Sequence, residues 1–268
     1  MEYPDPPRAI LETNVPHSAR IWNYWIGGKD HYPIDRHIGD EVAQMLPSIV
    51  AQARADRLFL ARAVRYLVSE EGIRQFLDIG TGIPSADNTH EVAQSVAPES
   101  RIVYVDNDPI VLAHARALLT SIPEGKCDYI DADLRDPAAI LAAAVKTLDF
   151  SEPIALMLLG ILHHLPDEDE PRAIVAHLMA ALPPGSFLAV NHATNVVFGD
   201  QSDQAVRRWN QVGKPSITLR SPQQIQRFFD GLELVPPGVV SCSRWRPEHN
   251  PWGEPEEVDE FCGLGGKP

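Results

Sequence analysis

Short apolar runs alternate regularly with segments of helical period from Arg74 onward. The runs predict strands at 74–80, 101–107, 127–133, 153–160 and 186–192. Between them, apolar residues recur with the three- and four-residue spacing of helices, at 87–97, 109–120, 137–147 and 168–182. Because helix-length crossovers join parallel strands, this order predicts a parallel sheet covered on both faces, with 153–160, apolar throughout, as a central strand.

The pattern changes after Ser216. Ser221 and Pro222 are typical of an N-cap and a first helical residue, so a helix is predicted to start there. The segments "LELVPPGVVSCSRW" and "VDEFCGLG" follow with no full helix between them, which indicates a terminal antiparallel hairpin. The expected fold is therefore α/β, with a Rossmann-like sheet of seven strands, most of them parallel.

Residues 1–72 have a different pattern and predict a helical extension. After a proline-rich start, the extension ends in a helix whose apolar positions keep the i, i+3, i+4 spacing: Val50, Ala53, Leu60, Ala61, Val64 and Leu67. Gly72 is a plausible residue to close that helix. We expect the extension to pack on an α/β domain formed by 73–268 rather than to fold as an independent unit.

The net charge of −14 makes nucleic acid an unexpected partner, since an acidic surface repels phosphate. One helix carries a row of arginines that forms the best candidate for a basic face: Arg54, Arg57, Arg62 and Arg65. Pairing of these arginines with nearby acids on a solvated helix face is the favoured interpretation.

The chain carries no apolar run of the about 18 residues needed to cross a bilayer, and its start lacks the pattern of a signal peptide. The three cysteines, Cys127, Cys242 and Cys262, form no CxxC pair and are expected to be packing residues. A globular protein of the cytoplasm, with no membrane partner, is the expectation. The oligomeric state cannot be predicted from these features.

The stretch "FLDIGTGIPSADNTHE" is the strongest chemical signal, because it places glycines directly after the first predicted strand. A Walker phosphate loop and a GxSxG nucleophile elbow are excluded by their absence from the sequence. The dinucleotide fingerprint is closer, since Gly80, Gly82 and the later Asp106 fit it. However, Pro84 and Ser85 stand where the third glycine of a pyrophosphate site is required.

Asp78 also argues against a pyrophosphate, because a carboxylate before the glycines repels a diphosphate and attracts a cation. S-adenosylmethionine combines a ribose with a positively charged end. Asp106 would hold its ribose, Asp78 would face its ammonium and sulfonium groups, and Asp133 would accept a hydrogen bond from the adenine amino group. The ends of neighbouring parallel strands lie at one edge of a sheet, where such a ligand binds.

The motifs "FLDIGTGIP", "IVYVDNDP" and "YIDADLRDP", followed by "ILHHLPD", resemble those of class I S-adenosylmethionine-dependent methyltransferases. The leader "SARIWNYWIGGKDHYPIDR" and the segment "FFDGLELVPPGVVSCSRWRP" are similar to a bacterial family of S-adenosyl methyltransferases that was once known only as a domain of unknown function. The resemblance runs from about Ser18 to the end. It implies S-adenosylmethionine as the cofactor and these binding residues: Asp78, Gly80, Thr81, Gly82, Asp106, Asn107, Asp133, Leu134 and Gly160.

The segment after the fourth strand departs from the wider superfamily, because Gly160-Ile161-Leu162-His163-His164 replaces an acidic or Asn-Pro-Pro-Tyr motif. This departure disfavours methylation of amino groups in DNA or glutamine. His163 or His164 could remove a proton from a hydroxyl or thiol acceptor, or both could be packing and capping residues, so the catalytic residue stays open. No metal site is expected, since the acids 167–170 open a predicted helix.

The aromatic residues of the leader are candidates for a lid over the cofactor, with Gly27-Gly28 as a hinge: Trp22, Tyr24, Trp25 and Tyr32. The alternative is that they only anchor the extension. The region from Thr194 to Thr218 is the other predicted wall of an acceptor site.

These patterns favour a methyltransferase that acts on an unidentified, small-molecule nucleophile. A sensor or scaffold that binds S-adenosylmethionine or S-adenosylhomocysteine without turnover is a second hypothesis, because the acceptor site is poorly defined. An NAD-dependent oxidoreductase is a weaker third.

Overall fold

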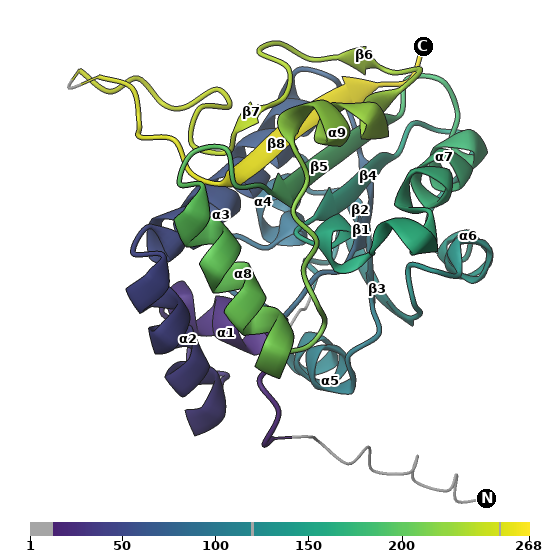
Figure 1. The fold of residues 1–268 in the computed structure, drawn as a ribbon. Helices are drawn as coiled ribbons and strands as arrows, with labels where there is room; N and C mark the ends of the chain where they lie inside the picture. The colour runs from purple at the N-terminus through teal and green to yellow at the C-terminus, as the bar shows by residue number, and fades with distance from the viewer. Residues whose placement is uncertain (1–12, 119–120, 252) are drawn as a thin grey trace, which may run out of the picture.

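A single twisted sheet runs through the molecule. The computed structural model describes residues 13–118, 121–251 and 253–268. The parallel strands are β1 (Gln75–Ile79), β2 (Arg101–Asp106), β3 (Lys126–Asp131), β4 (Ala155–Leu159) and β5 (Phe187–Ala193). They lie in the order β3-β2-β1-β4-β5, so β4 is central, as predicted, and the chain reverses its direction of winding between β1 and β4 (Figure 1).

The far end of the sheet is antiparallel. Strand β8 (Glu260–Gly266) pairs with β5 on one side and with β6 (Glu233–Leu234) and β7 (Val240–Ser241) on the other. Both short strands lie along the same edge of β8, and Pro236-Pro237 separates them because proline has no N–H to donate to the ladder. Together β6 and β7 take the place of one strand, which confirms the predicted fold and its antiparallel terminal pair.

Helices cover both faces of the sheet. On one face, α3 (Ile49–Ser69) and α4 (Thr89–Val96) share an apolar cluster with residues such as Phe76 and Ile102. On the other face, α6 (Pro137–Ala144), α7 (Pro171–Ala181) and the segment after α9 (Pro222–Gln226) pack on residues such as Leu77 and Val103. Alternate residues of one strand thus enter opposite cores, as expected for a strand buried on both sides.

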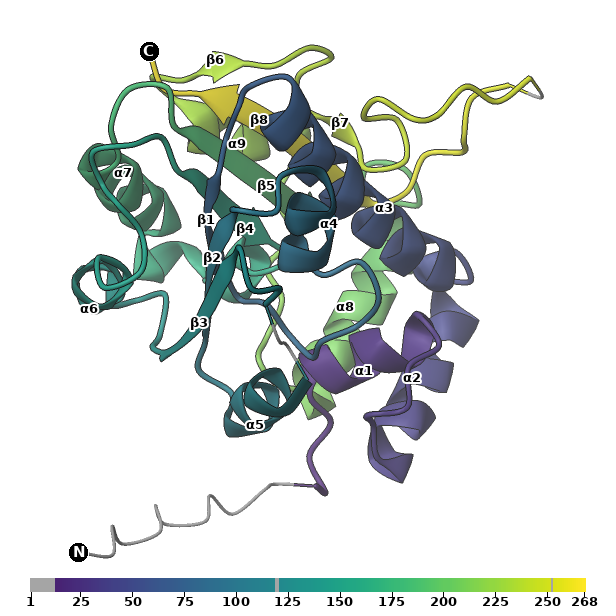
Figure 2. The same ribbon diagram turned by 180° about the vertical axis from the view of Figure 1, so that it is seen from behind.

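Three helices form a cap at the carboxyl ends of the parallel strands: α1 (Ser18–Trp25), α2 (Pro33–Met45) and α8 (Asp200–Val212). They share a third apolar cluster, which includes Ile21, Val42 and Trp209 (Figures 1 and 2). The cap therefore combines the N-terminal extension with an insertion after β5. Helix α5 (Pro109–Leu118) lies at the same end of the molecule.

The predicted extension is helical where it is described, and its first twelve residues lie outside the described residues. Its last helix, α3, belongs to the layer that covers the sheet, because Phe59, Val64 and Leu67 lie in the same cluster as the strand residues. The last two residues of the predicted helix 109–120 are also outside the described residues.

The predicted helix 168–182 begins later than expected. Asp167–Asp169 form a separate 3₁₀ turn, and α7 starts at Pro171 after Glu170, which has a left-handed φ of 50°. The expectation that these acids open the helix is therefore wrong. Asp169 instead pairs with Arg135 at 2.7 Å, and Asp167 pairs with Arg220 at 2.6 Å.

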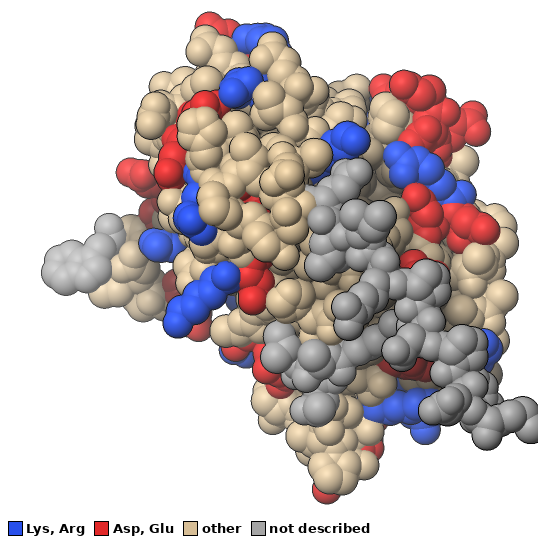
Figure 3. Space-filling view, turned by 90° about the horizontal axis from the view of Figure 1, so that it is seen from below, with Lys and Arg blue, Asp and Glu red and all other residues tan. Residues whose placement is uncertain are grey.

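Within the part of the chain that the structure describes, Arg57 and Arg62 on α3 bind backbone carbonyls, whereas pairing with acids was expected. Arg57 donates to the carbonyls of Ala86 and Asp87, and Arg62 donates to those of Cys242 and Trp245. These guanidinium groups hold loops against the helix. Seen from the cap end, acidic and basic side chains are interspersed over the described surface that faces the viewer (Figure 3).

The cysteines are free, and Cys242 and Cys262 are buried in the core as predicted. Within the part of the chain that the structure describes, no helix is both long and apolar enough to span a membrane.

Candidate cofactor and acceptor site

A cavity lies between the carboxyl ends of the strands and the cap, and the glycine loop forms part of its floor. Gly80 follows β1 with a φ of +78°, and a Cβ at this position would lie 2.6 Å from the Cβ of Ile161. Gly82 also has a positive φ, of +62°. The glycines are therefore required by the backbone and by the close approach of the loop that follows β4.

Asp78 and Asp106 both line this cavity, as the sequence predicts for carboxylates at successive strand ends. Asp78 is buried and accepts a hydrogen bond from Thr89 Oγ1 at 2.6 Å. Asp106 accepts from the N–H of Gly82 at 3.0 Å and from that of Asp108 at 2.9 Å. Burial raises the pKa of each carboxyl to about 6. A cation bound beside them would favour the ionised forms.

Asp133 occupies a different position from Asp78 and Asp106. It accepts from Asn107 Nδ2 at 3.0 Å and from the backbone N–H of Arg135, and it is not among the residues that line the cavity. Leu134 is buried in the core beneath the sheet. Asn107 does line the cavity, so it lies between the cavity and Asp133. The contact of Asp133 and Leu134 with adenine stays a prediction.

The helix that follows the glycine loop does not start at the glycines, although its N-cap Asn88 and its first residue Thr89 line the cavity. Helix α4 begins only at Thr89, well after Gly82, and the carboxylate of Glu91 accepts from the N–H of Asn88 at 2.8 Å. In dinucleotide folds the pyrophosphate binds to free N–H groups of a helix that starts at the glycines. This geometry disfavours a diphosphate at the loop.

Gly160, at the end of β4, is held by a residue that the sequence patterns did not single out. Its N–H donates to Asn191 Oδ1, and Asn191 Nδ2 donates to the carboxylate of Asp56 on α3. The side chain of Trp22 also hydrogen-bonds Asp56, and burial raises the pKa of this carboxyl to about 6. Asp56 thus joins the helical layer, the strand ends and the cap at one point of the cavity wall.

His163 and His164 both line the cavity and both are buried. His164 donates from Nδ1 to the carbonyl of Ser216 at 2.9 Å, whereas His163 Nδ1 lies 4.0 Å from Glu260 Oε1. Burial lowers the pKa of His164 to about 4 and holds that of His163 well below its usual value. Both imidazoles are therefore neutral near pH 7.

A buried guanidinium supports the turn that carries these histidines. Arg220 donates to the carbonyls of Leu162 and Leu165, and its Nη1 lies 2.9 Å from His192 Nε2. His192 donates from Nδ1 to the carbonyl of Ala193, so its Nε2 accepts from Arg220. Arg220 and His192 were not predicted, because the contacts that bury them come from segments far apart in the sequence.

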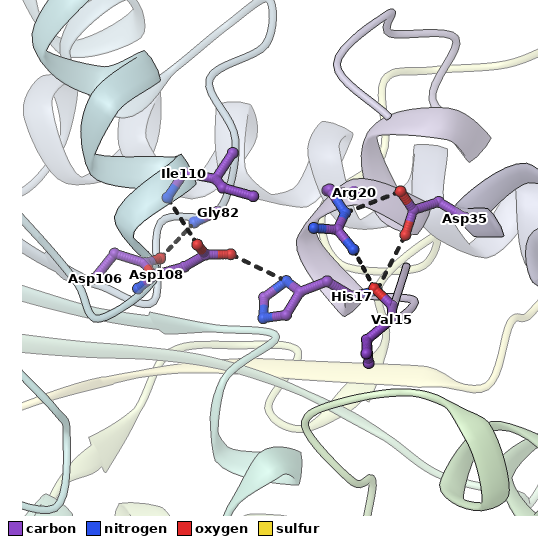
Figure 4. A network of polar contacts seen from close by, with 8 residues as sticks. All are labelled: Val15, His17, Arg20, Asp35, Gly82, Asp106, Asp108 and Ile110. Atoms are coloured by element: carbon purple, nitrogen blue, oxygen red, sulfur yellow. Dashed lines mark hydrogen bonds and ion pairs between the residues drawn. The ribbon is translucent and has the colours of Figure 1, made fainter. Parts of the chain in front are cut away.

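The start of the cap is joined to the loop after β2 by a polar network (Figure 4). His17 Nδ1 lies 3.2 Å from Asp108 Oδ2, and the His17 N–H donates to Asp35. Asp35 also pairs with Arg20 at 2.9 Å, and both side chains are at most 2% exposed. The first turn of α1 is therefore fixed between α2 and the loop that carries Asp106.

The aromatic residues of the leader have separate roles. Trp22 and Trp25 line the cavity. Tyr24 donates to Asp40, and the ring of Tyr32 lies against Arg20, so these two support the helices of the cap. Several residues of the predicted wall from Thr194 to Thr218 also line the cavity: Thr194, Ser202, Ala205, Val206, Trp209, Pro215 and Ile217. Opening of the cap about Gly27-Gly28 stays a prediction.

The cavity lies where the strand order reverses and has carboxylates near the ends of β1 and β2, the position at which open α/β sheets bind their ligands. A sequence model described as S-adenosyl methyltransferase matches residues 4–268. The chain thus belongs to the S-adenosyl methyltransferase family, which makes it an S-adenosylmethionine-dependent methyltransferase. The predicted cofactor is confirmed, and the alternative of an NAD-dependent oxidoreductase finds no support.

Solved structures agree with this assignment. A DUF574 family protein from Streptomyces avermitilis is 44% identical, with a TM-score of 0.91, over 96% of this chain and 99% of the other. A proposed methyltransferase from Thermobifida fusca is 37% identical, with a TM-score of 0.87, over 99% of each chain.

One curated relative shares a shorter region. Trans-aconitate 2-methyltransferase from Escherichia coli is 28% identical over 149 residues, which cover 56% of this chain and 51% of the relative. The chain therefore matches about half the length of this relative.

Proposed function

We propose that the protein transfers the methyl group of S-adenosylmethionine to a small molecule enclosed between the sheet and the cap. The observation that carries this proposal is the continuity of the cavity, which extends from Asp78 and Asp106 to the ends of β4 and β5. Its roof is largely apolar and includes Trp22, Trp25 and Trp209. An enclosed cavity with an apolar roof fits a small acceptor better than a segment of a macromolecule.

Within this proposal, Asp106 binds the ribose hydroxyls, since the two N–H groups it accepts leave further lone pairs free. Asp78 stabilises the positively charged methionine end. Gly80, Thr81, Gly82 and Gly160 allow the cofactor to approach the backbone, and all four line the cavity. Asn107 contacts the adenosine, and Asp133 with Leu134 completes the adenine side.

The reaction is a direct displacement. A lone pair of the acceptor attacks the methyl carbon, the carbon–sulfur bond breaks with its electron pair on sulfur, and S-adenosylhomocysteine and a methylated product form. The acceptor loses its proton to water or to a neighbouring base. Because the sulfonium is already an activated donor, the protein contributes mainly alignment and the exclusion of water. His163, neutral and buried, can accept a hydrogen bond from the acceptor.

The acceptor of the curated relative is not carried over to this chain. Trans-aconitate bears carboxylate groups, whereas the walls of this cavity contain several carboxyl groups, among them Asp56, Asp78 and Glu260. A polyanion would be repelled there unless cations compensated. We therefore propose an acceptor that is not a polyanion.

The proposal is tested by following the transfer of a labelled methyl group from S-adenosylmethionine to a small molecule. Purified protein is incubated with methyl-labelled S-adenosylmethionine and the small-molecule fraction of a bacterial extract, and labelled products are separated from the cofactor. Label in a new small molecule that requires active protein supports the proposal. Cofactor binding with no transfer to any extract would favour the sensor or scaffold instead. The Asp106→Asn variant is the control, because it should lose both binding and transfer.

We also propose the cytoplasm as the location of the protein. The free thiols of Cys127, Cys242 and Cys262 support this, since thiols persist in a reducing compartment.

A further inference from the structure

Four buried polar atoms belong to residues that line the cavity. They are Gln52 Oε1 on α3, His163 Nδ1 after β4, Thr194 Oγ1 after β5 and Glu260 Oε1 at the start of β8. None has a hydrogen-bond partner among the described residues, and each side chain belongs to a residue at most 5% exposed. Unpaired polar atoms in a protein interior cost free energy, so they indicate a group that is bound during function.

The positions of these atoms are fixed by the contacts that their residues do make. Gln52 Nε2 donates to Glu260 Oε2 at 3.0 Å, which leaves Gln52 Oε1 as an acceptor facing the cavity. Glu260 Oε1 lies 4.0 Å from His163 Nδ1. The Thr194 N–H donates to the carbonyl of Asp259, next to Glu260 in the chain. Gln52, His163 and Glu260 therefore form one cluster, although they come from three separate segments, and Thr194 lines the same cavity.

We propose that this cluster binds a primary amino group of the methyl acceptor, and that the acceptor is an amine with an apolar body. The proposal rests on the proposed function, because it assigns the acceptor half of the same cavity. Gln52 Oε1 accepts hydrogen bonds, Glu260 Oε1 accepts in the ionised form that a neighbouring cation favours, and Thr194 Oγ1 can accept as well. An ammonium group offers three donors, whereas a hydroxyl offers one and a carboxylate none.

The charges around the cluster agree with a cationic guest. Asp56 lies close enough to Glu260 to raise its pKa, in addition to the larger effect of burial. An ammonium beside these two carboxyl groups would compensate for the burial of charge. An anionic guest would instead oppose ionisation of both carboxyl groups. The apolar body of the guest would contact the roof formed by Trp25, Leu46 and Trp209, which line the same cavity.

Three probes that share one apolar body test the proposal: phenethylamine, phenethyl alcohol and phenylacetate. Each is titrated calorimetrically into protein saturated with S-adenosylhomocysteine. We expect phenethylamine to bind at least about tenfold more tightly than the alcohol, and phenylacetate to bind more weakly than either. Glu260→Gln should weaken amine binding about tenfold or more and leave the affinity for S-adenosylhomocysteine unchanged. Thr194→Val should weaken it less.

Glu257→Gln is the matched control, because it makes the same change of charge at an exposed position three residues away. Thermal melting of each variant shows whether it is folded. Phenylacetate binding as tightly as phenethylamine, an unchanged amine affinity in folded Glu260→Gln, or no binding of any probe would overturn the proposal. Failure of S-adenosylhomocysteine to bind the wild type would count against the proposed function instead, so the two are distinguishable.

Discussion

His17 at the start of the cap lies 3.2 Å from Asp108 in the loop that follows β2, and this contact joins the N-terminal extension to the segment that carries Asp106. Asp108 is two residues from Asp106 and donates its N–H to that carboxylate. Burial lowers the pKa of His17 more than Asp108 raises it, so the imidazole is neutral near pH 7. The contact can fix the cap over the cofactor without a buried charge on the histidine.

Replacement of His17 should therefore loosen the cap. We expect His17→Ala to accelerate dissociation of S-adenosylhomocysteine several-fold while the melting temperature changes little, because the histidine is only partly buried. Stopped-flow dissociation measures the rate. His37→Ala, on the exposed side of α2, is the matched control and should behave as the wild type. Equal rates for both variants would show that the contact does not hold the cap closed.

Asp106 should be the strongest single determinant of cofactor affinity. Asp106→Asn keeps the size of the side chain but removes the charge and one acceptor oxygen, and we expect a loss of about tenfold to a hundredfold in affinity. Calorimetry with S-adenosylhomocysteine measures it. Asp149→Asn provides the control, since the Asp149 carboxylate accepts from the N–H and the hydroxyl of Ser151 in its own turn and Asp149 is not among the residues that line the cavity. An affinity loss of less than about threefold in Asp106→Asn would argue against ribose binding at this position.

Gly80 and Gly72 provide a comparison of two glycines with similar backbones. Both have a positive φ, +78° and +70°, but a Cβ at Gly72 meets nothing within 4 Å whereas one at Gly80 meets Ile161. Gly72→Ala should cost about 1–2 kcal/mol in the free energy of unfolding. Gly80→Ala should cost more and also weaken cofactor binding. Chemical denaturation and calorimetry test both, and equal stability losses would contradict the close approach of Ile161.

Cofactor affinity should depend on pH through the buried carboxyl groups. The pKa values of Asp78 and Asp106 are raised to about 6, from an ordinary value of 3.8. The folded protein without cofactor therefore holds protons on these carboxyls more tightly than the unfolded chain does. The resulting contribution to the free energy of unfolding is complete below pH 3.8 and is lost as the pH rises through about 6. A bound cation reverses this effect because it favours the ionised carboxylates.

S-adenosylmethionine should consequently bind more weakly at pH 5 than at pH 7.5, and binding near pH 6 should release protons. Calorimetry in buffers of different ionisation enthalpy measures the number of protons released. Tighter binding at pH 5 than at pH 7.5, or proton uptake near pH 6, would mean that these carboxyls do not face the cation.

The sequence predicted the features that depend on local pattern. Alternating strands and helices defined the sheet, and Asp78 and Asp106 follow from their positions at strand ends. The predicted start of α7 was wrong. Two of the acids at 167–170 pair with distant arginines, and the helix begins only after them. The antiparallel hairpin was predicted, but the break of its first strand into β6 and β7 at Pro236-Pro237 was not.

The acceptor half of the cavity could not be predicted, because its residues come from segments far apart in the chain. One signal was present: Gln52 and Asp56 are polar residues spaced i, i+4 on the apolar face of α3, where they have no structural reason to be unless they reach a site. Glu260 gave no comparable signal. It enters the cavity only because β8 runs antiparallel to β5.

The most direct test of the account is a calorimetric titration of the wild-type protein with S-adenosylmethionine, with S-adenosylhomocysteine and with NAD. We expect one site per chain for the first two, with micromolar or tighter dissociation constants, and no detectable binding of NAD. Binding of NAD without binding of either sulfur nucleoside would contradict it.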